Sequence, residues 1–167
     1  MRILTVQQPW ARAIIDGGKD VENRTRNIAG DYRGPVAIHA GKVYSPHGAE
    51  IMLQQGLVPN GWPDLLGSEW SESDWPRGAI IGVVDLVAAH SAQNCRGRTV
   101  TDQLSASHFR GYHLPTCTPW AELNGWHLEL ANPRSLAEPI PYRGALGLRT
   151  LPTDITARIL RALGEPA

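Results

Sequence analysis

Some segments of this chain have the apolar pattern of β-strands and others the apolar spacing of α-helices, and the two kinds alternate irregularly. Runs rich in β-branched and small apolar residues predict strands near 2–6, 35–40, 78–90, 126–131 and 145–149, and an extended segment is expected over residues 20–24. Helical spacing bounded by proline or glycine predicts helices near 9–16, 45–53 and 152–163. The segment 139–144, PIPYRG, indicates an edge or a turn. This mixture of elements predicts an α+β fold.

The spacing of these elements narrows the architecture. Short strands joined by long, turn-rich connections favour a small closed or half-closed β-barrel of about five strands with flanking helices. A doubly wound sheet is disfavoured, because the chain has neither GxGxxG nor a Walker motif. We expect one domain over residues 1–167, with irregular insertions near 56–78 and 91–119.

Composition agrees with a globular protein. The 167 residues are 42% hydrophobic and 19% charged, and the formal net charge is zero, which argues against strong sequence-independent binding to nucleic acid. The region 1–43 nevertheless has an excess of basic residues, so a local basic face is possible. No segment has the layout of a signal peptide or a membrane span, and two cysteines form no disulfide framework. We expect a cytoplasmic protein that has no membrane partner.

The stretch 7–27, QQPWARAIIDGGKDVENRTRN, concentrates polar chemistry after a short helix. Gln7 and Gln8 lie at a strand-to-helix junction, and their amides can donate and accept as base recognition requires. Lys19, Glu22 and Arg24 combine a potential base, a carboxylate and an anion clamp. In an ideal strand Lys19 would face away from the other two, so convergence requires a turn or bulge near 17–18. The alternative is a solvated run of charges.

The pattern Q-P-W-A-x-x-I-x-x-G-x-K-x-x-E-x-R, from Gln8 to Arg24, resembles the opening motif of ASCH domains. The resemblance continues through VAIHA, WPRGAIIGVVDLV, WHLELANPRSL and PYRGALGL, and leaves out the tryptophan-rich loop and residues 91–119. It implies a PUA-like fold, a small β-barrel with helices around a cleft. It also implies a ligand among RNA, nucleotides and modified bases.

One branch of that family comprises amidohydrolases that remove the acetyl group from N4-acetylcytidine. Their pattern has a lysine, a threonine three residues later and a distant glutamate. Lys19 matches the lysine, Glu22 occupies the threonine position, and Asp85 in GVVDLV is the candidate for the distant carboxylate. Catalysis here would then use Lys19 and Glu22 to activate water. Other members are linked to ribonuclease activity or DNA binding, so the resemblance implies a ligand class more strongly than a reaction.

Two polar residues in apolar runs have two interpretations each. Asp85 either pairs with Arg24 or a backbone cap, or lies at the cleft floor and receives a cation or a base amine. His39 is either a hydrogen-bonded core residue or part of the cleft wall.

Aromatic and arginine side chains complete the predicted ligand site. Trp75 is the preferred candidate for stacking on a base. Trp10, which belongs to the motif, is a second ligand-binding candidate, although it is expected to pack on the barrel. Arg24 or Arg26 would contact phosphate.

Residues 91–119 contain a possible metal motif, Cys95-x12-His108-x4-His113-x3-Cys117. Thiolates and imidazoles suit zinc, although the spacing matches no standard finger and unrelated loop residues are the alternative. A Cys95–Cys117 disulfide is disfavoured in the cytoplasm. We therefore expect no required cofactor, with a structural zinc as a hypothesis.

Three functions remain open. The first is binding of RNA, a nucleotide or a modified nucleobase in a cleft lined by the 7–27 motif. The second is hydrolysis of N4-acetylcytidine or RNA, with Lys19, Glu22 and Asp85 as the catalytic residues. The third is a protein-interaction adaptor that uses the two irregular insertions.

Overall fold

The computed structural model describes residues 1–59, 62, 75–95 and 117–166. This part of the chain forms, in order, β1 (Arg2–Gln8), α1 (Trp10–Asp16), β2 (Val21–Arg24), β3 (Gly34–Tyr44), α2 (Pro46–Gln54), β4 (Ala79–Ser91), the 3-10 helix η2 (Ala92–Asn94), β5 (Trp126–Pro141), β6 (Leu148–Thr150) and α3 (Thr153–Ala162). None of the helices described is long and apolar enough to cross a membrane.

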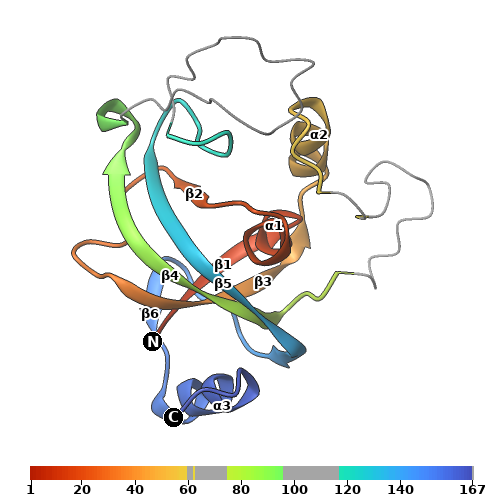
Figure 1. Cartoon of the computed structure of the whole chain (residues 1–167), viewed down its shortest axis with the longest axis vertical. Helices are drawn as coiled ribbons and strands as arrows, with labels where there is room; N and C mark the ends of the chain where they lie inside the picture. Colours follow the sequence, from red (N-terminus) through yellow and green to blue (C-terminus); the bar gives the residue numbers. More distant parts are fainter. Residues whose placement is uncertain (60–61, 63–74, 96–116, 167) are drawn as a thin grey trace.

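The described strands form one mixed sheet in the order β2-β5-β4-β3-β1-β6. Strand β1 runs parallel to β3, and the other neighbouring pairs are antiparallel. The long strands β4 and β5 curve strongly (Figure 1). The α+β prediction is confirmed, but the sheet has six strands rather than about five, and β2 and β6 remain its two edges. Barrel closure is therefore not observed in the described part of the chain.

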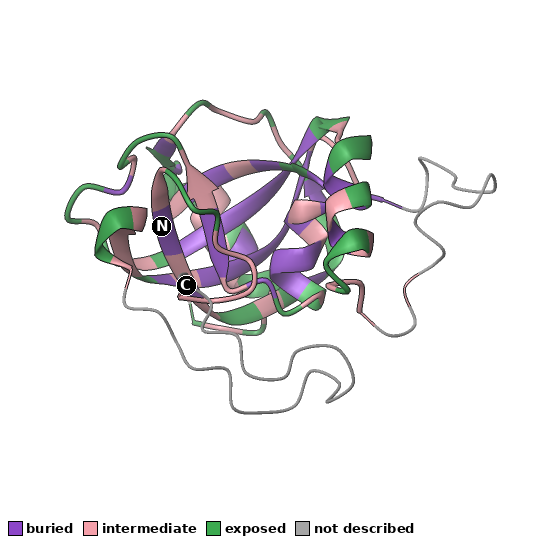
Figure 2. Ribbon diagram, turned by 90° about the horizontal axis from the view of Figure 1, so that it is seen from above, coloured by how far each residue is buried: buried purple, intermediate pink, exposed green. Residues whose placement is uncertain are grey.

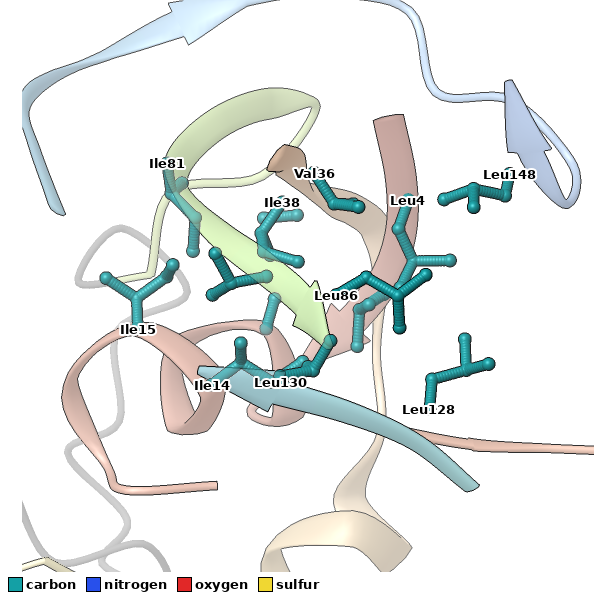
Figure 3. Close-up of a cluster of buried hydrophobic side chains, with 14 of the residues drawn as sticks. Leu4, Ile14, Ile15, Val36, Ile38, Ile81, Leu86, Leu128, Leu130 and Leu148 are labelled. Carbon is teal, nitrogen blue, oxygen red and sulfur yellow. The ribbon is translucent and has the colours of Figure 1, made fainter. Parts of the chain in front are cut away.

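Apolar side chains cover both faces of this sheet. On one face, residues of β1, β3 and β4 such as Leu4, Ile38 and Val84 pack with Ile14 and Ile15 of α1 (Figure 3). On the other face, Ile80 and Val83 of β4 pack with Ile159 of α3. Burial on both sides explains why β4 is almost continuously apolar from Ala79 to Leu86. Figure 2 shows the buried residues concentrated along these strands.

Strand β5 differs most from its prediction. The expected strand 126–131 continues to Pro141, through two prolines that suggested a break. Asn132 has a φ of 50°, and the β4–β5 register shifts here, so the chain accommodates Asn132-Pro133 as a bulge. Strand β2 pairs only with Trp126–Glu129. After Glu129, β4 is the one neighbouring strand described beside β5. A backbone N–H on the other side of β5 then has no strand partner there, so proline is tolerated.

Candidate functional site

A tight turn after α1 sets the position of Lys19. The backbone N–H groups of Gly17 and Lys19 both donate to the carbonyl of Ala13, at 3.0 and 2.9 Å. Gly18 between them has a φ of 71°, a conformation that favours glycine. The chain therefore reverses before β2 begins, which removes the strict alternation that would have separated Lys19 from Glu22.

The three charged residues of the motif converge on Glu22. Its Oε2 lies 3.6 Å from Nζ of Lys19, and its Oε1 lies 3.1 Å from a terminal nitrogen of Arg24. The same Arg24 nitrogen donates to the carbonyl of Thr5 at 2.8 Å, which ties the cluster to β1. Nε of Arg24 is buried and has no hydrogen-bond partner among the described residues. Glu22 is thus a nearly buried carboxylate between two cations.

Two indole rings surround the Lys19 side chain, which is only 3% exposed. Nζ lies 5.5 Å from the ring centre of Trp10 and 5.8 Å from that of Trp120, and it donates to the carbonyl of Val21. Burial lowers the pKa of Lys19, and the nearby Glu22 carboxylate opposes that change. The amine is therefore easier to deprotonate than an ordinary lysine.

Trp120 reaches the motif from a distant part of the sequence. The Asn23 side chain donates to the Trp120 carbonyl at 2.8 Å and accepts from the N–H of Glu122 at 3.1 Å. The indoles of Trp10 and Trp120 meet edge to face, with centres 6.3 Å apart. Sequence reasoning did not place Trp120 here, because no local pattern links it to residues 19–24.

The two glutamines of the motif have different environments. Gln8 is completely buried, and its amide donates to the carbonyl of Pro76 while its oxygen accepts from the N–H of Arg12. These bonds fix the junction between β1 and α1, so Gln8 acts here as a structural bridge rather than as a free base-reading group. Gln7 and Arg26 are exposed.

Asp85 belongs to another ion network. Its carboxylate accepts from Arg134 at 2.8 Å and from Asn132 at 2.9 Å, and Arg134 also contacts Glu165 beyond α3 at 3.0 Å. Arg24, one of the alternative partners considered for Asp85, pairs with Glu22 instead. Among the residues described, Asp85 makes no contact with Lys19 or Glu22.

Two further candidates lie in the core. Trp75 is 2% exposed and packs edge to face against Tyr44 and Trp62, so its ring is not open to a base in this structure. His39 is also buried, and its Nε2 lies 2.9 Å from the carbonyl of Tyr142. Burial lowers the pKa of His39, which agrees with its interpretation as a core residue.

The cysteines of the possible metal motif meet two different histidines. Cys95 and Cys117 lie with His90 at the end of β4 and His127 at the start of β5, and the four candidate ligand atoms are all within 4.8 Å of one another. His108 and His113 lie outside the described residues. Sequence reasoning missed His90 and His127 because both belong to predicted strands, although each is close in sequence to a cysteine.

The two thiols lie close enough for Cys95 to change the pKa of Cys117. The N–H of Cys117 donates to Sγ of Cys95 at 2.8 Å, and both cysteines are free rather than disulfide-bonded. Burial, together with the adjacent Cys95, raises the pKa of Cys117 to about 12. The Cys117 thiol therefore loses its proton less readily than an ordinary cysteine.

Comparison with known proteins identifies the family. A search of curated proteins finds no match. The family model of the ASCH domain matches residues 4–139, which contain both the 19–24 charge cluster and the strands that support it. ASCH domains have a PUA-like fold and are generally linked to RNA binding or hydrolysis. The match covers well over half of the sequence, and this chain belongs to the ASCH domain family.

Proposed function

We propose that this ASCH domain binds a nucleotide, a modified nucleobase or an unpaired base of RNA at the Lys19–Glu22–Arg24 cluster. The observation that supports it best is the position of Glu22, whose carboxylate lies between Lys19 at 3.6 Å and Arg24 at 3.1 Å. The carboxylate oxygens of Glu22 are acceptors of the kind that can bind the exocyclic amine of a base.

The surroundings of the cluster suit the rest of a nucleotide. The Arg24 side chain is 29% exposed, and Arg26 is exposed two residues later. Both are available to a phosphate or ribose oxygen. Trp10 is partly exposed beside the same cluster and offers an aromatic edge or face to a base. Because the chain has no net charge, we expect few phosphate contacts and a shallow salt dependence.

Hydrolysis of an acylated base such as N4-acetylcytidine, or of RNA, is the second candidate. The lowered pKa of Lys19 favours it, since a neutral amine can accept a proton from water. Glu22 would then orient that water, while the indoles of Trp10 and Trp120 keep bulk solvent away. Asp85 has no place in this version, because its carboxylate is paired with Arg134.

The test is a screen of nucleosides, N4-acetylcytidine and short single-stranded RNAs, with binding and hydrolysis measured on the same samples. We expect Glu22→Gln to weaken binding by about tenfold, which corresponds to the loss of one charge-assisted hydrogen bond. Asp85→Asn is the matched control, because it changes a carboxylate that is also paired with an arginine but at a different place. Equal loss in both variants, or no binding by the native protein, would contradict the proposal.

Lys19→Ala separates binding from catalysis. Loss of turnover with retained affinity would establish the hydrolase, whereas loss of affinity in a protein without turnover would establish a binding module.

A further inference from the structure

The end of β4 and the start of β5 bring four metal-binding side chains together. His90 and His127 are directly opposite each other in the antiparallel β4–β5 register. Cys95 follows η2, and Cys117 precedes the segment that leads into β5. These two strands therefore supply the histidines, and the chain that leaves β4 and returns to β5 supplies the cysteines.

Three distances between the ligand atoms, all measured from His127, match the edges of a tetrahedral zinc site. Nδ1 of His127 lies 3.3 Å from Nε2 of His90, 3.6 Å from Sγ of Cys95 and 3.4 Å from Sγ of Cys117. For tetrahedral zinc with Zn–N of about 2.0–2.1 Å and Zn–S of about 2.3 Å, the N–N and N–S separations are about 3.4 and 3.6 Å. The three separations from His127 thus match those of a four-coordinate site, and all four candidate ligand atoms lie within 4.8 Å of one another.

Outer hydrogen bonds orient both imidazoles toward this centre. Nε2 of His127 is 2.7 Å from the carbonyl of Glu122, which can only accept, so this nitrogen carries the proton. Nδ1 of His90 is 2.9 Å from the carboxylate of Glu129. The lone pairs of neutral rings then lie on Nδ1 of His127 and Nε2 of His90, which face each other. Such carboxylate and carbonyl partners are typical of metal-bound histidines.

We propose that His90, Cys95, Cys117 and His127 form a closed, structural zinc site of the Cys2His2 type. Two thiolates balance the charge of Zn²⁺, and a ligand set of two sulfurs and two imidazole nitrogens in a tetrahedron is characteristic of zinc. The N–H of Cys117 donates to Sγ of Cys95, which keeps the two cysteines side by side at this centre. The site replaces the ligand set expected from sequence, with His90 and His127 in the places of His108 and His113.

The site also fixes the segment between Cys117 and His127. This segment contains Trp120, which contacts Lys19 and Trp10, and its backbone is bonded to Asn23. Zinc would therefore hold Trp120 against the charge cluster from one side, while Asn23 holds it from the other. The zinc proposal itself does not depend on which ligand the charge cluster binds.

The first test is the metal content of the untagged, full-length protein, purified under reducing conditions and measured by plasma mass spectrometry. We expect one zinc ion per chain. Replacement by Co²⁺ should give the intense visible bands of a tetrahedral site and charge-transfer bands from two thiolates. This measurement uses the native sequence, so it remains decisive if ligand variants do not fold.

Variants then identify the ligands. Cys95→Ser, Cys117→Ser, His90→Gln and His127→Gln should each reduce the zinc content from one toward zero, and removal of zinc should change the tryptophan emission of the protein. His108→Gln, His113→Gln and the exposed His47→Gln are the matched controls and should retain one zinc per chain.

Three results would overturn the proposal. They are a folded native protein without zinc, a native Cys95–Cys117 disulfide, and loss of zinc in the His108 or His113 variants.

Discussion

The side chain of Asn23 donates to the backbone carbonyl of Trp120 at 2.8 Å, across 97 residues of sequence. The same amide accepts from the N–H of Glu122. This pair of bonds joins β2, which contains the charged motif, to the segment that carries the second indole at Lys19. Asn23 is therefore the residue that connects the family motif with the more distant part of the candidate site.

Asn23→Ala should detach Trp120 from the motif. Two hydrogen bonds are lost, and the net cost of each is about 0.5–1.5 kcal/mol, so we expect the free energy of unfolding to fall by about 1–3 kcal/mol. The tryptophan emission should also shift to longer wavelength, because Trp120 becomes more exposed to solvent. Denaturant unfolding and emission spectra provide the measurement.

Asn27→Ala is the control for this variant. Asn27 also makes two hydrogen bonds, but to the nearby N–H groups of Ala29 and Gly30. It should lower stability without the change in emission. An identical emission shift in both variants would show that Asn23 has no special role in positioning Trp120.

Glu22→Gln should be strongly destabilising. It leaves the buried ammonium of Lys19 without its counter-charge, and breaking a buried ion pair costs about 3–5 kcal/mol. We expect the free energy of unfolding to fall by about 2–3 kcal/mol. The loss is at the lower end because the Arg24 side chain is partly exposed, so water solvates its charge when the Glu22 carboxylate is removed.

A double-mutant cycle with Lys19→Met tests the cause of that loss. Removing both charges should cost less than the sum of the two single substitutions, since neither partner is then left buried and unpaired. Additive losses, measured by urea unfolding, would mean that the two side chains do not interact.

The lowered pKa of Lys19 predicts a pH dependence of stability. Below the folded pKa, Lys19 is charged in both states and the full cost of burying that charge is present. As pH rises from the folded pKa toward the usual value of 10.5, the folded protein loses its proton before the unfolded chain does. The unfolded state then binds more protons, so the contribution of Lys19 to stability rises over this interval.

Lys19→Met should remove this rise in stability at alkaline pH. Other titrating groups affect the native protein and the variant alike. The measurement is the difference in unfolding free energy between native protein and variant across alkaline pH. A difference that stays constant with pH would contradict the lowered pKa.

Gly82→Ala should disturb the contact between β4 and β5. A Cβ at this position would lie 2.6 Å from the carbonyl oxygen of Arg134 and 2.7 Å from a methyl carbon of Ile15. Overpacking of this kind costs about 1–3 kcal/mol. Thermal unfolding would report it as a lower Tm.

Gly41→Ala is the matched substitution in a neighbouring strand. Its nearest neighbour would be the carbonyl oxygen of Val6 at 3.4 Å, an ordinary contact, so Tm should change little. Equal losses at both glycines would indicate a general cost of alanine in these strands rather than a specific clash.

Local patterns in the sequence were sufficient for much of the fold. Strand and helix periods, with proline and glycine at their ends, predicted most elements, because apolar spacing records which face each segment buries. The motif from Gln8 to Arg24 indicated the family that the full comparison confirms. Strand β5 is longer than predicted. A bulge at Asn132-Pro133 lets the strand continue past a proline that would ordinarily end it.

Contacts between distant segments depended on tertiary structure alone. The β4–β5 register places His90 opposite His127, and no spacing in the sequence fixes that register. Arg134 rather than Arg24 became the partner of Asp85 for the same reason. The sequence by itself determined which chemical groups this protein has and which local segments hold them. Strand pairing decided which of those groups meet, because it depends on burial and hydrogen bonding summed over the whole sheet.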